Sequence, residues 1–400
     1  HGLPVELGVE KSLGITKEDI GKKISVDDYN AACRREVMKY TREWTDMTHR
    51  MGYWVDLDDP YITYDSRYIE SVWWLLKQLY DKGYLYKGYT IQPYSPAAGT
   101  GLSSHELNQP GCYRDVKDTT ATVLFEVTDP KPEMTGWGTP CFMAWTTTPW
   151  TLPSNTALCV GPKFDYVAVR TYNPYTGEKI TVVLAEALVK SYFKADGEKA
   201  DLDSYNKGDK LVPWRIVGRW SGPELVGMRY RQLMPWVKPC EKCSEISPEY
   251  VKAYAATHPG KVFSVRNDNF VEMAEEAFRV IAGDYVTTDD GTGIVHIAPT
   301  FGADDAKVAK AAGVPGLYMV TPRGDTRPMV DLQGKYFLLD DLAPEFVEKC
   351  VNVPEYSRHV GEYVKNAYDP RFNEGGKYDQ LAAEKAEDHR VVLRFVLRRQ

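Results

Sequence analysis

The first 92 residues carry the apolar spacing of amphipathic helices. In "SVDDYNAACRREVMKYTREWTDMTHRMG" the apolar side chains recur at helical intervals. Asp27 or Asp28 is a suitable N-cap for this segment, and Gly52 is a suitable stop. We therefore predict one long helix between these positions.

A second helix is predicted over "DSRYIESVWWLLKQLYDKG". Asp65 or Ser66 would cap its start, and Gly83 would follow its end. Its apolar residues share one side of the helix and form a stripe that we expect to be buried, made of Ile69, Val72, Trp73, Leu76, Leu79 and Tyr80. Neither helix carries chemistry of its own.

From about Tyr94 the pattern changes to short β-branched or aromatic runs separated by Gly, Pro, Asn and Asp. They include "TATVLFEVTD", "PCFMAWTTT", "TALCVG", "YVAVRTY", "KITVVLAE" and "GIVHIAP", with short helical segments between them. The predicted fold class is α+β. We expect a β-rich, barrel-like domain with surrounding helices over residues 93–370, a helical flanking segment over 1–92 and a return segment over 371–400.

Composition and charge narrow the class of protein. A chain of 400 residues with 43% hydrophobic and 26% charged residues is typical of two or three globular domains. The formal net charge of −7 argues against a generally basic nucleic-acid binder. A nucleic-acid partner would have to meet a local patch, such as "RYRQ" at Arg229–Gln232 or the closing "RFVLRRQ".

Cysteine usage and the chain ends indicate the compartment. Seven scattered cysteines favour reduced thiols in a cytosolic protein. No apolar run approaches the length of a membrane span, and no signal peptide opens the chain. The chain starts at His1 instead of Met, so we expect an excised part of a longer protein.

The stretch "WTTTPWTLPSN", Trp145 to Asn155, has no acid, base or thiol, yet it concentrates hydroxyl groups. In a strand Thr146 and Thr148 would point one way and Thr147 the other. Pro149 cannot donate to a sheet, so the strand must end there or lie at an edge. The hydroxyls suit a ribose, an ester carbonyl or a positioned water, but threonine is also simply a good strand former.

A second stretch, "GTGIVHIAPTFGADDAKVAKAAG", predicts a strand that ends at His296, a loop, and a helix opened by Asp304 and Asp305 and closed by Gly313. One interpretation makes Asp304 an N-cap and His296 an ordinary strand residue. The other places a carboxylate at a strand–loop–helix junction, where it could hold a cationic amine. Adjacent aspartates on a helix point to different sides, so only one need face a pocket.

The pair Cys240 and Cys243 has the spacing of a metal-binding knuckle. A structural zinc site needs four ligands, and His258 is the only further candidate nearby, so free thiols are the preferred interpretation. The chain has no Gly-rich phosphate loop, no HExxH and no hydrolase-type serine elbow.

Taken together, "HGLPVE", "WTTTPWTLPSNTA" and "GTGIVHIAPTFGADD" resemble isoleucyl-tRNA synthetases, class I aminoacyl-tRNA synthetases with an inserted editing domain. The resemblance extends from His1 to about Asp369 and includes "GLSSHEL" and "GEYVKNAYD". The sister enzymes for valine and leucine carry Arg-Pro after the threonines. Here Pro149 and Trp150 follow instead, which is similar to the isoleucine branch.

The resemblance implies that both ATP-binding signatures lie outside this chain. The chain would then form no aminoacyl-adenylate, and it would contain the connective-peptide domain that hydrolyses valine misattached to isoleucine tRNA. The longer enzyme would ligate isoleucine to tRNA with ATP and Mg, whereas editing would need no cofactor. We expect a monomeric, cytoplasmic protein with tRNA as its partner and with no DNA or membrane partner.

The same resemblance assigns roles to residues. Asp305 matches the family aspartate that binds the α-ammonium group, and His296 would line the side-chain pocket and exclude isoleucine. The threonine-rich peptide would surround the terminal adenosine and the ester and would position the water without acting as a nucleophile. We count as catalytic Asp305, Thr146, Thr147 and Thr148, and as substrate-binding His296, Trp145, Thr151 and Asn155.

One departure concerns zinc. Family members often have a Cys pair where this chain reads "YSPAAG", with Ser95 and Ala98, and the partner pair would fall beyond the end of the chain. We therefore expect no zinc in this part of the enzyme. Two rival functions stay open from the residues, a binding module without turnover and the editing domain of a valyl enzyme.

Overall fold

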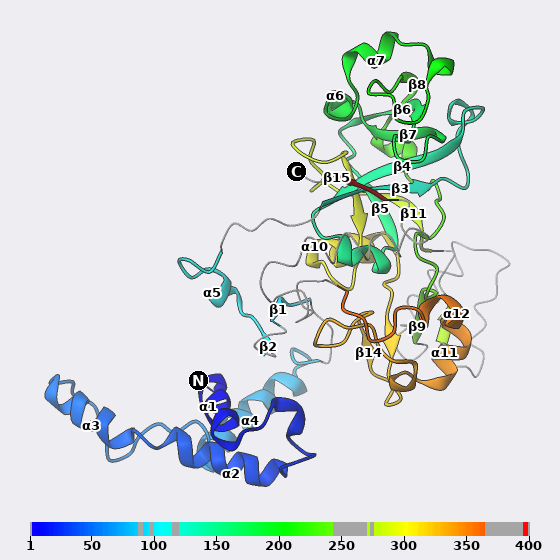
Figure 1. The fold of residues 1–400 in the computed structure, drawn as a ribbon. Helices are drawn as coiled ribbons and strands as arrows, with labels where there is room; N and C mark the ends of the chain where they lie inside the picture. Colours follow the sequence, from blue (N-terminus) through cyan, green and yellow to red (C-terminus); the bar gives the residue numbers. More distant parts are fainter. Residues whose placement is uncertain are drawn as a thin grey trace. The chain divides into compact units, whose positions relative to one another are not determined.

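The structure is a computed structural model that describes residues 2–86, 91–95, 100–113, 120–242, 270–272, 276–364 and 395–398. The chain divides into two compact units, His1–Tyr89 and Thr90–Gln400 (Figure 1). Each unit is described by itself.

The first unit is helical. Its elements are α1 (Gly2–Leu13), the 3-10 turn η1 (Lys17–Asp19), α2 (Val26–Val37), α3 (Thr41–Arg50) and α4 (Ser66–Asp81). The prediction of one long helix up to Gly52 is wrong, because the helix ends at Val37 and a second helix begins at Thr41. The N-cap of α2 is Ser25, whose Oγ accepts a hydrogen bond from the Asp28 N–H at 3.0 Å. A hydroxyl one turn before the aspartates therefore fixes the start of the helix.

Helix α4 has the predicted ends but not the predicted burial. Asp65 is its N-cap and accepts a hydrogen bond from the Arg67 N–H, and Gly83 follows it with φ of 74°. None of its residues is buried, and Trp73 is 70% exposed. The prediction of a buried stripe is wrong because, within the described residues of this unit, no element covers the apolar side of α4.

The second unit contains one large sheet. Its strand order is β15–β3–β4–β7–β6–β8, and every pair is antiparallel except β4–β7, which is parallel. The strands are β3 (Thr120–Glu126), β4 (Thr139–Thr146), β6 (Asp165–Tyr172), β7 (Lys179–Ala185), β8 (Arg215–Ser221) and β15 (Phe395–Arg398).

A smaller sheet has the order β11–β5–β12. Here β5 (Ala157–Val160) lies between β11 (Arg279–Ala282), parallel to it, and β12 (Ile294–Ile297), antiparallel to it. Three two-stranded ladders complete the strands: β1 (Tyr94–Ser95) with β2 (Thr100–Gly101), β9 (Cys240–Lys242) with β10 (Phe270–Glu272), and β13 (Met319–Val320) with β14 (Thr326–Arg327).

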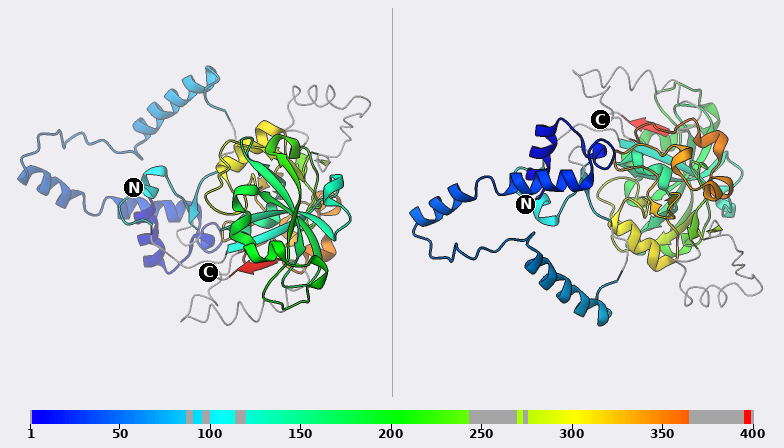
Figure 2. Two further views of the ribbon diagram at one scale, coloured as in Figure 1. Left: turned by 90° about the horizontal axis from the view of Figure 1, so that it is seen from above. Right: turned by 90° about the horizontal axis from the view of Figure 1, so that it is seen from below.

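Short helices connect and cover these sheets. The α-helices are α5 (Ser104–Leu107), α6 (Val189–Tyr192), α7 (Ala195–Lys199), α8 (Gly222–Leu225), α10 (Ala303–Ala312), α11 (Pro344–Cys350) and α12 (Val353–Tyr356). The 3-10 helices are η2 (Pro132–Met134), η3 (Pro149–Ser154), η4 (Glu186–Leu188), η5 (Leu202–Ser204) and η7 (Leu339–Asp341). Helix α10 lies against the outside of the strands in both views of Figure 2.

The main hydrophobic core lies between the two sheets. Phe142 and Ala144 of β4 contribute to it from one side, and Leu158 of β5 and Ile294 of β12 from the other. Because side chains alternate along a strand, the neighbours of Phe142 on β4 join a second cluster on the outer face of the large sheet, packed by Tyr192 of α6. A third cluster, which includes Ala309, packs α10 against the outer face of the small sheet.

The predicted β-rich α+β class with surrounding helices is confirmed. Among the described strands the two sheets remain separate, and no barrel closes. Each sheet instead keeps one face in the shared core and covers the other with its own helices.

The segment "RYRQ" lies partly in the core and partly on the surface. Tyr230 is 3% exposed and forms an isolated β-bridge with Val127. Arg229 donates to the Ala277 carbonyl at 3.3 Å, and Arg231 pairs with Glu126 at 3.2 Å. Tyr230 thus belongs to the core, whereas the Arg231 side chain stays 69% exposed, so a contact of this segment with nucleic acid remains a prediction. In "RFVLRRQ" residues 395–398 form the backbone of β15, and the other residues lie outside the described ones.

The cysteine prediction holds in part. Cys33, Cys112, Cys141 and Cys159 form no disulfide, but Cys350 is disulfide-bonded, so the expectation of reduced thiols is wrong at Cys350. A disulfide depends on the spatial distance to a second thiol, which spacing in the sequence does not give.

The knuckle prediction falls mostly on residues that are not described. Cys243 and His258 lie outside the described residues, and for Cys240 the structure gives the backbone of β9. Within the described residues no group of three or more His, Cys, Asp or Glu side chains is arranged to hold a metal ion. In the same part of the chain, no helix has the length and apolar character that crossing a membrane requires.

Candidate active site

The threonine-rich peptide leaves the large sheet at Thr146. Strand β4 ends at this residue, and Pro149 then begins the 3-10 helix η3. Proline lacks an N–H and has a fixed φ, so it cannot extend the ladder but is well suited to the first position of a helix. The predicted strand end is confirmed, and the peptide turns from the end of β4 into the core.

The hydroxyl groups of this peptide form a continuous hydrogen-bonded chain. The Thr146 and Thr148 Oγ1 atoms are 3.2 Å apart, and Thr146 Oγ1 also accepts from the Thr148 N–H at 3.0 Å. The Thr151 hydroxyl lies 3.4 Å from that of Thr148 and donates to the Thr148 carbonyl at 2.8 Å. The chain continues to His296, whose Nε2 lies 3.0 Å from Thr151 Oγ1. Two distant motifs thus meet across the two sheets.

His296 is neutral at physiological pH. It is 7% exposed, and burial lowers the pKa of its imidazole to about 4. Thr151 has a single hydroxyl proton, which goes to the Thr148 carbonyl, so Nε2 of His296 must be the donor toward Thr151. Nδ1 is then an unprotonated acceptor, and it is buried without a partner among the described residues. An unpaired acceptor costs less to bury than an unpaired N–H.

Asp305 lies in the first turn of α10, next to the end of the strand that carries His296. Gly302 is the N-cap of this helix, and the αL residue Gly313 closes it with φ of 67°. The Asp305 Oδ2 atom accepts from the Ala298 N–H at 2.9 Å, which ties the carboxylate to the end of β12. As expected for adjacent residues, Asp304 is exposed while Asp305 is half-buried.

The surroundings of Asp305 favour a strong interaction with a cation. Burial, with a contribution from the charge of Asp304, raises the pKa of the Asp305 carboxyl above its usual value, although the Ala298 N–H opposes the shift. Burial also raises the pKa of the neighbouring Cys159 thiol to about 11 and raises the pKa of Tyr285. Both neighbours therefore stay neutral, and the half-buried carboxylate would gain from a cationic ligand.

Three predicted site residues, Thr147, Asn155 and Trp145, lie apart from the hydroxyl chain. Thr147 is exposed, and its hydroxyl bonds to no described residue. Asn155 is 2% exposed, and its amide bonds to Ala157, Ile297 and Tyr230. The Asn155 side chain is therefore buried beneath the threonine-rich peptide, where its amide is bonded to other residues of the chain.

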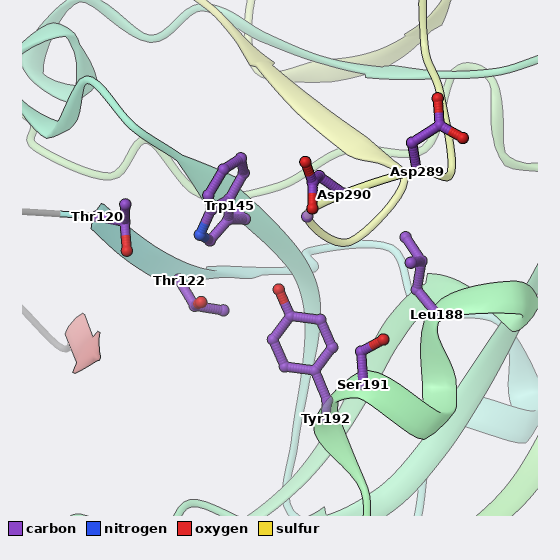
Figure 3. Close-up of a pocket in the computed structure, with 9 residues that line it drawn as sticks. Thr120, Thr122, Trp145, Leu188, Ser191, Tyr192, Asp289 and Asp290 are labelled. Atoms are coloured by element: carbon purple, nitrogen blue, oxygen red, sulfur yellow. The ribbon is translucent and has the colours of Figure 1, made fainter. Parts of the chain in front are cut away.

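Trp145 points to the opposite face of β4 from Thr146. It lines a separate pocket of about 140 Å³ on the outer side of the large sheet. Figure 3 shows its indole facing Asp290, with the Tyr192 hydroxyl pointing into the space between β3 and the loop that carries Asp289 and Asp290. Gly291 packs on the indole so closely that a Cβ there would lie 3.0 Å from Cε3. The structure thus does not bring Trp145 together with the threonines.

Sequence reasoning missed Tyr230. Its hydroxyl donates to Asn155 Oδ1 at 2.7 Å, although 75 positions separate the two residues. No local pattern marks such a contact, because the hydrophobic alternation around Tyr230 indicates burial but not the partner of a buried hydroxyl.

Gly302 tests how tightly the Asp305 carboxylate is held. A Cβ at this N-cap would lie 2.8 Å from both Cγ and Oδ2 of Asp305. We expect Gly302→Ala to lower the free energy of unfolding by about 1–3 kcal/mol, through crowding and the poorer N-cap. Urea unfolding followed by circular dichroism measures this change. In the Asp305→Ala background the same substitution should cost clearly less, and an equal cost would contradict the placement of the carboxylate.

Comparison with known proteins gives a consistent set of relatives. Residues 1–358 match the family described as tRNA synthetases class I (I, L, M and V). The chain is 63% identical over 398 residues to the isoleucine–tRNA ligase of Bacteroides thetaiotaomicron, covering 100% of this chain and 32% of that protein. It is 61% identical over 370 residues to the isoleucine–tRNA ligase of Porphyromonas gingivalis, covering 92% of this chain and 30% of that protein.

The chain therefore spans about a third of the length of the curated relatives that it matches. Among solved structures, the editing domain of the P. knowlesi cytosolic leucyl-tRNA synthetase aligns with a TM-score of 0.35 and 9% identity, over 72% of this chain and 98% of that one.

Proposed function

Because the chain belongs to the family of tRNA synthetases class I (I, L, M and V), we propose that it hydrolyses the ester that joins a misattached valine to isoleucine tRNA. The observation that carries the proposal is the neutral chain from Thr146 through Thr148 and Thr151 to His296, together with the half-buried carboxylate of Asp305, which accepts from the N–H of Ala298, two residues after His296. The longer enzyme would ligate isoleucine to tRNA with ATP and Mg in the cytoplasm, as a monomer.

Editing compensates for the limited ability of the site that activates isoleucine to reject valine. One methylene in a hydrophobic pocket is worth only about 1–3 kcal/mol, and isoleucine against valine is the standard example of this limit. A second site that admits valine but is too small for isoleucine supplies the missing discrimination. His296 suits its wall because, as a neutral and rigidly bonded ring, it adds bulk without adding charge.

The chemistry assigned to the site is positioning. The Asp305 carboxylate holds the α-ammonium group of the aminoacyl ester. The Thr146 and Thr148 hydroxyls orient the attacking water and the ester carbonyl, since each hydroxyl donates and accepts. The hydroxyl chain contains no group that is charged at neutral pH, so it acts through orientation and not as a strong base.

The direct test compares two esters. The purified 400-residue chain should hydrolyse valyl-tRNA about 10–200-fold faster than isoleucyl-tRNA, both made with isoleucine tRNA. The measurement is the release of labelled amino acid with chain in excess over tRNA. Equal hydrolysis of both esters contradicts the proposal. Binding of a non-hydrolysable valyl-adenosine analogue without deacylation would favour a binding module, and preference for threonyl-tRNA with valine tRNA would favour a valyl enzyme.

A further inference from the structure

Asn155 is the link between the threonine-rich peptide and the strand that carries His296. It follows η3 directly, and its Nδ2 donates to the Ala157 carbonyl at 2.8 Å and to the Ile297 carbonyl at 3.4 Å. Ala157 begins β5, and Ile297 ends β12. The amide therefore holds the end of η3 against the paired ends of β5 and β12.

The remaining side of this amide is held by Tyr230. The phenol donates to Asn155 Oδ1 at 2.7 Å, the shortest of the three bonds that the Asn155 side chain makes. Burial raises the pKa of Tyr230 well above its usual value, so the hydroxyl keeps its proton and stays a donor. This bond also fixes which way the amide faces, because only Oδ1 can accept it.

The ring of Tyr230 is itself rigidly held. It is 3% exposed and packs edge-to-face against Phe125 of β3 at 5.3 Å and against Phe278 at 6.2 Å. Its backbone forms a β-bridge with Val127. Tyr230 thus presents a fixed hydroxyl to the peptide that carries Thr148 and Thr151.

We propose that Tyr230 is a positioning residue for the editing reaction, which acts through Asn155 to keep the threonine hydroxyls at their distance from His296. This rests on the proposed hydrolysis of valyl-tRNA. Tyr230 touches no reacting atom; its hydroxyl orients the Asn155 amide, the amide fixes η3 to the ends of β5 and β12, and η3 carries Thr151 to His296 Nε2.

The test removes only the hydroxyl. In Tyr230→Phe we expect kcat for valyl-tRNA to fall about 10- to 100-fold, because small displacements of positioned groups cost rate, while KM stays within about twofold. The matched control is Tyr356→Phe, where an equally buried phenol donates to the Phe337 carbonyl at 3.0 Å and where kcat should not change. Unchanged kcat in Tyr230→Phe, or an equal loss in both variants, overturns the proposal.

A double variant tests the route of the effect. If Tyr230 acts through Asn155, then Tyr230→Phe combined with Asn155→Ala should have the kcat of Asn155→Ala alone, and multiplied losses overturn the proposal. If Tyr230→Phe does not fold, Asn155→Asp takes its place in the test. This substitution keeps the oxygen that accepts from Tyr230 but removes both hydrogen bonds that Asn155 donates. An unchanged kcat in Asn155→Asp would also overturn the proposal. Failure of the proposed function shows separately, as an inactive wild-type chain.

Discussion

Asp305→Ala should lower the hydrolysis of valyl-tRNA by about 100-fold, since it removes a charge-assisted contact to the α-ammonium group. The Asp305 carboxylate is half-buried, and its pKa is raised by burial, so it interacts with a cation in a less solvated setting than a surface carboxylate. The measurement is the single-turnover rate of deacylation with chain in excess. Full activity in Asp305→Ala would remove the basis of the proposed function.

Two matched variants separate charge from structure. Asp305→Asn keeps a carbonyl oxygen that can accept from the Ala298 N–H, yet it has no charge, so it should fold like the wild type and remain as slow as Asp305→Ala. Asp304→Ala removes the exposed neighbouring carboxylate and should retain the wild-type rate within about twofold. If Asp305→Asn were fully active, the role of Asp305 would be to hold the end of β12.

The second large effect is a loss of stability in acid that depends on His296. Its pKa is about 4 in the folded chain and near 6.5 when unfolded, so between these values the unfolded state binds more protons. Stability is therefore complete above about pH 7 and is lost as the pH falls through 6.5 toward 4. The whole shift corresponds to roughly 3 kcal/mol, of which about 2 kcal/mol should be lost at pH 5.

Urea unfolding at pH 7.5 and pH 5 measures this effect in the wild type and in His296→Gln. The variant cannot titrate at this position, so its stability should change with pH by about 2 kcal/mol less than that of the wild type. The pKa of Asp305 is raised, and this group works in the opposite direction, since its protonation relieves a buried charge. Because Asp305 is present in both proteins, the difference between them isolates His296. Identical pH profiles would mean that His296 is solvated or charged.

The sequence predicts the local parts of the site well. The end of β4 at Thr146 follows from the missing N–H of Pro149, and the end of α10 follows from the αL preference of Gly313. Thr146 and Thr148 share a side and Thr147 is exposed, as predicted, although β4 ends at Thr146 and a bond from the Thr148 N–H to the Thr146 hydroxyl brings the two together. In each case the determining interaction lies within a few residues along the chain.

The remaining features depend on contacts between distant segments. Strand alternation puts Trp145 on the face away from Thr146, but only the packing of α6 and the Asp290 loop makes that face a separate pocket. In the sequence Asn155 is only a polar residue of a hydroxyl-rich peptide. Its hydrogen bond with Tyr230 depends on the β-bridge between Val127 and Tyr230, which brings the two segments together. The broken helix near Val37 likewise follows from no apolar spacing.

The hydrogen bond between Thr151 and His296 joins a segment that leaves one sheet to a strand of the other. The imidazole Nε2 proton is therefore a spectroscopic probe of the contact between the two sheets, which we call the seam. In a nitrogen-15 spectrum the His296 ring would report whether that seam is intact, independently of the peptide amides. A chain that opens at the seam before it unfolds elsewhere would lose this one signal first.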